Sequence, residues 1–494
     1  MFPQIHRKAT AVRLRKSRLV VIIAALISLL LIVQLLHSYH TKLTGLLPLH
    51  HAPPACPNSP LLNDVLVVVR TGATEVLEKL PVHFSTVLTC VPDYIIYSDL
   101  EEDVEGHNIV DVLDRVRHDV RMNVPEFWLY NRLRASGREG LEYQTLFGSG
   151  PSGALDNPGW KLDKWKFLPM VSRALEHRPN AKWFVFIEPD TYLLWQNMLK
   201  YLSQFDASKP YYLGKYMYIG KVLFAHGGSG FMISNPAMQM VSKHWTENQD
   251  WFDDYTAKEW AGDMILGKAM ENIGIHLASA SPHIQINSLN TVDWTINKQD
   301  KPPWCYGPLT FHHMTEHEVR VLWQFEHGWL RNHDAATILR LHDIFTSTVQ
   351  PWLRSELADW DNQSRGTEYS DKALAKLSEG DRAALTQTER DAQASSEYCQ
   401  AACESKPECI QFFYSPGQCF ISNELRLGHA VEPLCVEYSH VEGKCVKIQD
   451  VSASGAVLEK VSSTKSGWIM DRVRRASEEM DKACQSLNGH DWVT

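Results

Sequence analysis

Short, uninterrupted apolar runs constrain the fold of this chain more than any other feature. Residues 64–70 (DVLVVVR) and 183–187 (WFVFI) contain β-branched or aromatic residues with no polar alternation. Strands of this kind are buried on both faces, which is typical of a parallel α/β sheet. A helix over residues 74–80 and a strand over residues 93–97 (DYIIY) would complete a strand–helix–strand unit. The sequence therefore predicts a mostly parallel α/β sheet, with a further amphipathic helix over residues 162–177.

A longer apolar run, residues 19–36, is interrupted only by Ser28 and Gln34. At about 1.5 Å per residue, this run is just long enough to cross the core of a bilayer. The residues before it are basic, and the first acidic residue is Asp64, so the bulk of the chain should lie on the non-cytoplasmic side. A cleaved signal peptide is the alternative, but its apolar region would be shorter and followed by small residues. We therefore expect a cytoplasmic tail over residues 1–18, an uncleaved signal anchor and a type II topology.

The cysteines all follow this predicted span, in a compartment where disulfides persist. They are Cys56, Cys90, Cys305, Cys399, Cys403, Cys409, Cys419, Cys435, Cys445 and Cys484. Cys399 and Cys403 would share one helix face, and Cys409 and Cys419 lie in strand-like segments. Four thiolates could instead bind zinc, but the spacing is not that of the CxxC pairs of zinc ribbons. We expect a disulfide-stapled module, in which Cys435 and Cys445 are candidates for a further bridge.

The composition excludes little but sets the domain plan. With 494 residues the chain is long enough for two or three domains, and its net charge of −9 does not indicate nucleic-acid binding. Sixteen Trp are consistent with a carbohydrate-binding cleft or with a large core. Asn362 begins the one N-glycosylation sequon of the sequence, which is weak support for a luminal protein. The predicted parts are a stem (37–60), a catalytic domain (61–335), a polar linker with one helix near 371–378 (336–395), the disulfide module (396–445) and a C-terminal tail (446–494).

Acidic residues follow the second buried strand directly, as Glu188, Pro189 and Asp190. The carboxyl ends of parallel strands open onto the crevice where α/β sheets bind ligands. Carboxylates there could hold Mg²⁺ or Mn²⁺, which usually keeps substrate phosphates in its coordination shell. The alternative is a solvated strand end with two unrelated acids.

Three later segments also carry chemistry. Residues 225–234 (AHGGSGFMIS) contain glycines that permit close backbone approach to a ligand, although an ordinary tight turn explains them too. Asp263 begins an amphipathic helix (GDMILG), either as its N-cap or as a general base for an attacking hydroxyl. His312 or His313 could complete a metal shell, and an extended backbone would point their rings to opposite sides.

Taken in order, these segments resemble glycosyltransferase family 31, the Fringe and core 1 β-1,3-galactosyltransferase group. The resemblance covers residues 64–317 and is carried by VLVVVRTG, IIYSD, WFVFIEPDTY, the tract from YYLGKYM to AHGGSGFMIS, GDMILG and LTFHHM. It implies a GT-A fold, an α/β sandwich with a nucleotide-binding half. It also implies a Mn²⁺-dependent inverting transferase that uses a UDP-sugar.

The resemblance assigns roles residue by residue. Asp190 and His312 match the metal ligands, Asp263 matches the catalytic base, and Glu188 matches the acid that faces the nucleotide. Pro189 replaces the family's middle acid. The remaining matches are Gly228, Ser229 and Gly230 at the donor sugar, and Arg70, Thr71 and Asp99 at the nucleotide end.

The cysteine pattern C-x3-C-x5-C-x3-F-x5-C-x-I resembles the PAN/apple family of binding modules. That resemblance implies the pairs Cys399–Cys419 and Cys403–Cys409. A family 31 domain with such a module points to a fungal-type member of the family.

We therefore expect a Golgi membrane hexosyltransferase, similar to an N-acetylgalactosaminide β-1,3-galactosyltransferase. Its partners would be a UDP-sugar donor, a glycan or glycoprotein acceptor and the membrane, but no nucleic acid. A homodimer and the choice among UDP-galactose, UDP-N-acetylglucosamine and UDP-glucose stay open. The alternatives are a lectin-like or chaperone-like protein on an inactive scaffold, which the loss of the middle acid favours, and an adhesion protein that works through its PAN-like module.

Overall fold

The computed structural model describes residues 55–141, 157–296, 302–431, 434–439, 444–449, 464–485 and 492–493. These residues belong to one compact unit that begins at Ala55. Its helices are all too short or too polar to cross a membrane, as far as the described ranges extend. The predicted tail, anchor and most of the stem lie outside the described residues.

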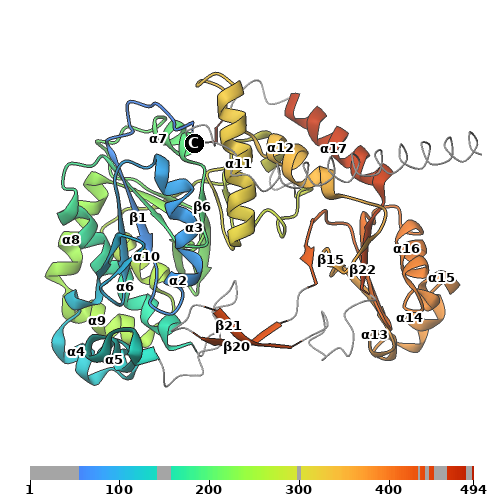
Figure 1. The fold of residues 1–494 in the computed structure, drawn as a ribbon, viewed down its shortest axis with the longest axis horizontal. Helices are drawn as coiled ribbons and strands as arrows, with labels where there is room; N and C mark the ends of the chain where they lie inside the picture. The colour runs from blue at the N-terminus through green and yellow to red at the C-terminus, as the bar shows by residue number, and fades with distance from the viewer. Residues whose placement is uncertain are drawn as a thin grey trace, which may run out of the picture. The chain divides into compact units, whose positions relative to one another are not determined.

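An eight-stranded mixed sheet forms the centre of the larger domain (Figure 1). Its strand order is β11-β7-β10-β5-β1-β2-β4-β3. Its central strand, β1, pairs in parallel with β2 and β5, which confirms the three predicted strands. The bounds are β1 Val65–Arg70, β2 Tyr94–Ser98, β3 Glu102–Val104, β4 His107–Asp111, β5 Trp183–Ile187, β7 Tyr212–Gly214, β10 Phe231–Ser234 and β11 Leu277–Ser279. A mixed α/β domain of this kind fits a GT-A-like fold.

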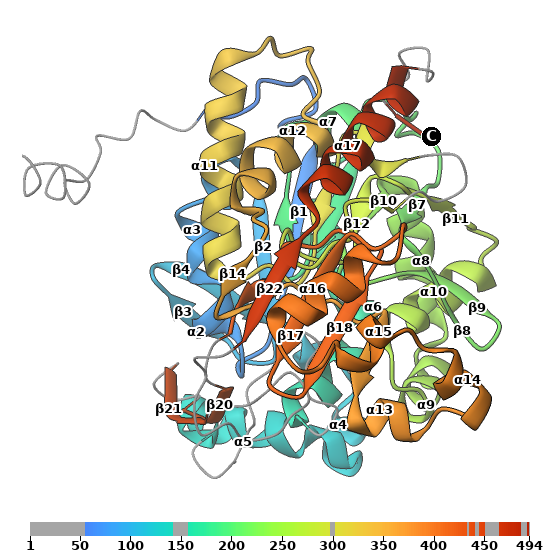
Figure 2. The same cartoon turned by 90° about the vertical axis from the view of Figure 1, so that its right-hand side faces the viewer.

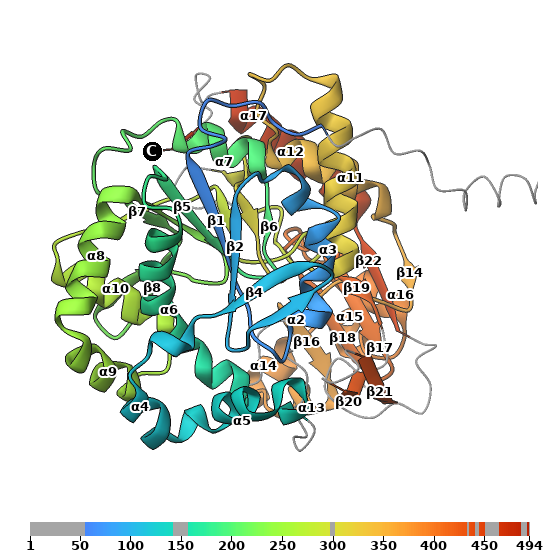
Figure 3. The ribbon, with the colours of Figure 1, turned by 60° about the vertical axis from the view of Figure 1, so that its left-hand side comes forward.

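Both faces of this sheet are buried. Val65, Val67 and Val69 of β1 pack into one core, while Leu66 and Val68 pack into the other. The second core is covered by α5, α6, α8 and α10, and the first by α2, α3, α7 and α11 (Figure 3). These helices are α2 Val76–Lys79, α3 Pro81–Phe84, α5 Trp128–Ser136, α6 Pro158–His177, α7 Trp195–Leu202, α8 Asn235–Glu247, α10 Gly262–Asn272 and α11 Glu316–Asn332, with α4 (His118–Asn123) and α9 (Gln249–Lys258) beside them.

Two smaller sheets complete the catalytic-type domain. Strand β6 (Tyr192–Leu193) pairs with β13 (Thr310–Phe311), which pairs in turn with β12 (Ile284–Gln285). This pairing brings the turn after β5 beside the two histidines that follow β13. Strands β8 (Tyr216–Ile219) and β9 (Val222–Ala225) form a separate hairpin.

The C-terminal region corrects the predicted domain plan. A five-stranded sheet has the order β14-β22-β17-β18-β16, and α16 packs on β17 and β18 (Figure 2). Its elements are β14 Leu357–Ala358, β16 Thr367–Ser370, α13 Asp371–Ala375, α14 Glu379–Ala384, α15 Gln387–Asp391, α16 Ser396–Glu404, β17 Gln411–Ser415, β18 Gln418–Ser422 and β22 Lys465–Trp468. Residues 336–395 are therefore not a linker, and the described residues 464–485 form a strand and a helix instead of a tail. The strands of this sheet were not predicted because they are short and pair with partners far away in the chain.

The remaining elements connect this module to the larger domain. They are α12 (Leu341–Ile344), the two-stranded pair β15 (Trp360–Asp361) and β19 (His429–Ala430), and α17 (Met470–Gln485). The Trp304 indole of the larger domain donates a hydrogen bond to Asp481 on α17. The backbone N–H of Trp294 donates to the Leu425 carbonyl. Strands β20 (Leu434–Ser439) and β21 (Lys444–Gln449) form a further antiparallel pair.

The described disulfides confirm the pairing that the resemblance implied. Cys399 pairs with Cys419 and Cys403 with Cys409. Two long-range bridges, Cys56–Cys90 and Cys305–Cys484, were not predicted. The second of these ties α17 to the larger domain. Cys435 and Cys445 lie in β20 and β21, whose side chains are outside the described structure, so their bridge stays a prediction.

Candidate active site

A cavity of about 510 Å³ lies where β1 and β5 end. Both strands run in parallel, so the residues that follow them meet at one edge of the sheet. Arg70, the last residue of β1, and Glu188, the first after β5, both line the cavity. So do Asp190, His312 and Asp263, which the sequence placed in separate motifs.

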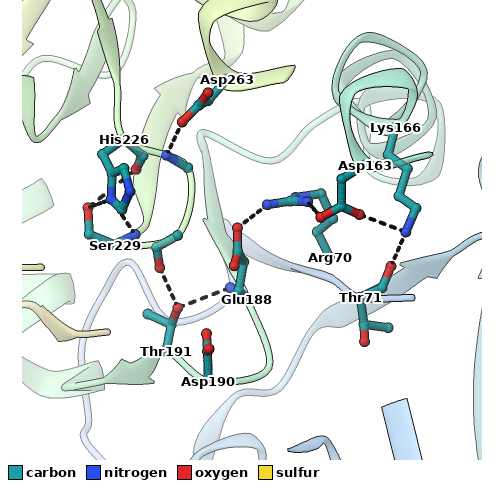
Figure 4. Close-up of polar contacts among 12 residues, drawn as sticks. Arg70, Thr71, Asp163, Lys166, Glu188, Asp190, Thr191, His226, Ser229 and Asp263 are labelled. Carbon is teal, nitrogen blue, oxygen red and sulfur yellow. Dashed lines mark hydrogen bonds and ion pairs between the residues drawn. The ribbon is translucent and has the colours of Figure 1, made fainter. Parts of the chain in front are cut away.

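The turn after β5 is fixed by hydrogen bonds from several elements. The Glu188 N–H donates to Thr191 Oγ1, and that hydroxyl donates to the Gly228 carbonyl at 2.6 Å (Figure 4). The Met314 N–H donates to the Asp190 carbonyl at 2.9 Å, and His83 Nε2 lies 2.7 Å from the Pro189 carbonyl. The backbone therefore holds the Asp190 carboxylate in one place.

Asp190, His312 and His313 together form a candidate metal centre. One ligand atom from each lies within 4.8 Å of the others. His312 Nε2 is 3.3 Å from Asp190 Oδ1, yet this buried oxygen makes no hydrogen bond of acceptable geometry. Nδ1 of His313 is equally without a hydrogen-bond partner. One carboxylate and two imidazoles suit Mn²⁺ or a similar divalent ion, so the donor set fits the expected metal.

The expectation that His312 and His313 point to opposite sides is wrong. It assumed an extended backbone, but His313 has a φ of 59°, in the left-handed region. The two ring centroids are consequently only 3.7 Å apart, and His313 Nδ1 is 3.9 Å from Asp190 Oδ2. His313 thus joins His312 as a candidate ligand.

Alternating charges run from the metal centre along the cavity wall. Glu188 lies 3.7 Å from His312 Nε2 and forms an ion pair with Arg70, whose guanidinium also contacts Asp163 at 2.6 Å (Figure 4). The Arg70 guanidinium also lies over the Phe167 ring at 4.4 Å. Each of these charges has an oppositely charged neighbour, so none of them is left without a partner in the cavity wall.

Lys79 and Glu75 extend this row on the far side of the metal centre. Lys79 Nζ is 3.1 Å from Asp190 Oδ2 and 3.0 Å from Glu75 Oε2. Glu75 is the N-cap of α2 and Lys79 is the last residue of that helix, and both side chains line the cavity. Sequence reasoning missed them, because one Lys and one Glu four residues apart are an ordinary helix pair.

The electrostatics of the metal centre follow from these neighbours. Burial alone would raise the pKa of Asp190, but Lys79 and the two histidines outweigh it and hold the pKa well below its usual range. Burial would lower the pKa of His312, whereas Asp190 and Glu188 raise it to about 9. Asp190 is therefore an ionised ligand at neutral pH, and His312 must lose a proton before it can coordinate a metal.

The glycine-rich segment packs directly against the metal centre. A Cβ on Gly228 would lie 2.3 Å from His312 Cε1, so this position requires glycine. Gly230 has a φ of +86°, and Ser229 is fully buried beneath the loop. Of the three predicted donor-sugar residues, Gly228 alone lines the cavity.

His226, in the same segment, was not singled out from the sequence. Its Nδ1 accepts a hydrogen bond from the Ser229 N–H (Figure 4), and its ring meets the His312 ring edge-on at 5.4 Å. Burial and the neighbouring His312 lower the pKa of His226 to about 4. It is therefore neutral at physiological pH and supports the loop without adding charge.

Asp263 faces the same cavity from the first turn of α10. The N-cap interpretation is wrong, because the N-cap is Ala261 and makes no side-chain cap. Asp263 Oδ2 instead accepts a hydrogen bond of 2.9 Å from the Gly227 N–H. Burial raises the pKa of Asp263 to about 6, although Gly227 and Arg70 act in the opposite direction. The carboxylate is thus ionised at neutral pH, and it is a stronger base than an ordinary aspartate.

The predicted nucleotide-end residues are divided between the cavity and the core. Arg70 lines the cavity, whereas Thr71 and Asp99 are buried behind it. The Thr71 carbonyl accepts a hydrogen bond from Lys166 Nζ (Figure 4), and Asp99 lies 2.9 Å from the same ammonium. The geometry gives Thr71 and Asp99 a supporting position under the cavity wall.

The Fringe-like family model matches residues 62–347, which is more than half of the chain. The matched range contains every residue that lines the cavity.

Proposed function

Since the chain belongs to the Fringe-like family of glycosyltransferases, we propose that it transfers a hexose from a UDP-sugar to an acceptor hydroxyl with the help of Mn²⁺. The proposed sugar is galactose, transferred in a β-1,3 linkage as by an N-acetylgalactosaminide β-1,3-galactosyltransferase. The acceptor would be a glycan or a glycoprotein. Transfer would invert the configuration at the anomeric carbon, as the resemblance implies.

One observation carries this proposal. The candidate metal ligands and Asp263 line a single cavity, on the two sides of the Gly227–Gly228 backbone. A Cβ on Gly228 would contact His312, and a Cβ on Gly227 would lie 3.3 Å from the Asp263 side chain. A donor diphosphate at the histidines and an acceptor hydroxyl at Asp263 would therefore be adjacent.

The chain's own residues would divide the chemical work. A metal bound by Asp190, His312 and His313 would supply positive charge to the departing diphosphate. Lys79 already contributes a positive charge beside Asp190. Asp263 would accept the proton of the attacking hydroxyl, and its hydrogen bond from Gly227 fixes the carboxylate for that step.

The same proposal places the protein in the Golgi as a single-pass type II membrane protein with a luminal catalytic domain. Its support is the apolar run at residues 19–36 and the described disulfides, which indicate an oxidising compartment. We assign the C-terminal module, similar to PAN/apple modules, the role of a tether that brings the acceptor close.

Calorimetric titration of the full-length protein with UDP, with and without Mn²⁺, tests the proposal. We expect UDP binding that requires Mn²⁺ and that falls by at least about 100-fold in an Asp190→Ala variant, since Asp190 is a candidate ligand itself. Asp254→Ala, at an exposed position on α9, is the matched control and should bind as the wild type does. Failure of the wild type to bind UDP under either condition would reject a UDP-dependent transferase.

The second candidate, an inactive lectin-like protein, is favoured only by Pro189 in place of an acid. Against it, Asp190, His312 and Asp263 all line the cavity. Binding of glycans without any Mn²⁺-dependent UDP binding would support this candidate.

A further inference from the structure

The cavity also has an aromatic and apolar part that the donor chemistry does not use. It is lined by Trp160, Met217, Tyr218, Phe224 and Trp260. Phe224 is buried, but Trp260 is 57% exposed and Tyr218 is 62% exposed. Large aromatic side chains gathered at the mouth of a cavity usually mark a binding surface.

Trp260 is fixed relative to the candidate base. It lies three residues before Asp263, and its ring stacks on Trp160 of α6 at 6.1 Å and 20°. Trp160 thus supports one face of Trp260, and the indole is held at the cavity mouth next to Asp263.

Tyr218 is fixed through the hairpin that carries it. Phe224, on the second strand of the hairpin, packs with Ala261 and Met264 around the start of α10. A Cβ on Gly267 of α10 would lie 2.4 Å from Phe224 Cβ, so hairpin and helix are in direct contact. Tyr218, Trp260 and Asp263 therefore belong to one packed unit.

We propose that Trp260 and Tyr218 form the acceptor subsite, and that its ligand is a hexopyranose ring of a glycan. The apolar C–H face of a pyranose matches an exposed indole or phenol, and the ring hydroxyls stay free for water and for Asp263. A peptide acceptor is the competing class, but it would require an array of backbone partners, whereas the cavity mouth presents side-chain rings. The inference rests on the proposed function, because it places the sugar whose hydroxyl Asp263 would deprotonate.

Saturation-transfer NMR on the full-length protein tests the subsite with methyl glycosides of galactose, N-acetylgalactosamine, glucose and N-acetylglucosamine as probes. We expect at least one glycoside to bind through the protons of one ring face. Trp260→Ala and Tyr218→Ala should each weaken this binding about tenfold or more, and Trp260→Phe should retain part of it. Mn²⁺-dependent UDP affinity should stay within about twofold, which also verifies that the variants are folded.

Trp251→Ala is the matched control, because Trp251 is 46% exposed, stacks on Tyr255 and does not line the cavity. Unchanged glycoside binding in both Trp260→Ala and Tyr218→Ala would overturn the proposal. So would a wild type that binds none of the glycosides but binds a threonine-containing peptide. A wild type that does not bind UDP would reject the proposed donor chemistry instead. Glycoside binding can still be measured in that case.

Discussion

Buried polar groups have different surroundings in the catalytic-type domain and in the C-terminal module. In the module, Asn362 is fully buried, and its amide donates to the carbonyls of Phe412 at 3.0 Å and Gly467 at 3.3 Å. Its Oδ1 accepts a hydrogen bond of 2.8 Å from the Ser364 hydroxyl. At the cavity, Asp190 is 5% exposed, and its Oδ1 lacks any such bond.

The difference separates polar groups that hold the fold from those available to a ligand. A buried polar group without hydrogen bonds lowers the free energy of unfolding. A group that serves only the stability of the fold should therefore have all its hydrogen bonds made. Asn362 meets that requirement. Asp190 does not, and its open oxygen faces two histidines and the cavity. Substitutions in the two regions should therefore affect different properties.

The largest effect is expected from Asp263→Asn. It keeps the shape of the side chain and removes the base, so kcat should fall by about 10²–10⁴-fold. Mn²⁺-dependent UDP affinity should change little. The free energy of unfolding should fall by no more than about 1 kcal/mol, because the amide oxygen of the variant side chain can still accept from the Gly227 N–H, and only the acceptor for the Met264 N–H is lost. Initial-rate kinetics, calorimetry and chemical denaturation measure the three quantities. Equal losses in rate and in UDP affinity would show that Asp263 serves the donor site.

Asn362→Asp should lower the stability of the protein and leave UDP binding unchanged. The carboxylate cannot donate to Phe412 and Gly467, and it would face both carbonyls without a partner. We expect a loss of about 3 kcal/mol in the free energy of unfolding, with UDP affinity unchanged in the protein that remains folded. Asn423→Asp, at an exposed position in the same module, is the control and should cost almost nothing. A stable Asn362→Asp variant would mean that a complete set of hydrogen bonds does not identify the polar groups on which the fold depends.

A smaller effect is expected from pH. Because burial raises the pKa of Asp263 to about 6, the base is ionised above that pH and protonated below it. At saturating substrate and at a Mn²⁺ concentration that keeps His312 coordinated, the rate should level off above pH 6 and should fall about tenfold per unit below it. The residual rate of Asp263→Asn should show no such fall between pH 5 and 7. An inflection near pH 4 in the wild type would contradict the raised pKa.

The sequence predicted the catalytic-type domain better than the module, for physical reasons. Strands β1 and β5 are buried along their whole length, so each appears as a continuous apolar run. Asp190, His312 and Asp263 each follow or begin a recognisable element. Neither Lys79 nor His226 has a local signal, because each reaches the site only through tertiary packing.

In the module, the cysteine spacing predicted the correct disulfides but not the sheet around them. Strand β14 has two residues and pairs with β22, more than a hundred residues later. Such a strand is too short for a periodic pattern, and its partner cannot be read from nearby residues. His313 shows the same limit at the scale of one residue, since its positive φ reverses the direction expected for its ring.

The last prediction is that the sequon at Asn362 carries no glycan, so glycosidase treatment should not change the mass of the protein. A glycan would attach to the same amide nitrogen that donates to Phe412 and Gly467, at a fully buried position. Attachment precedes folding, so a glycosylated chain could not form this module, and the folded protein should show no loss of mass on glycosidase treatment. Lys182→Thr supplies the positive control, because it creates a sequon at exposed Asn180. If that variant gains a removable glycan and the wild type has none, the burial and the hydrogen bonds of the Asn362 amide explain the difference. A removable glycan on wild-type protein that binds UDP would show that the Asn362 network opens.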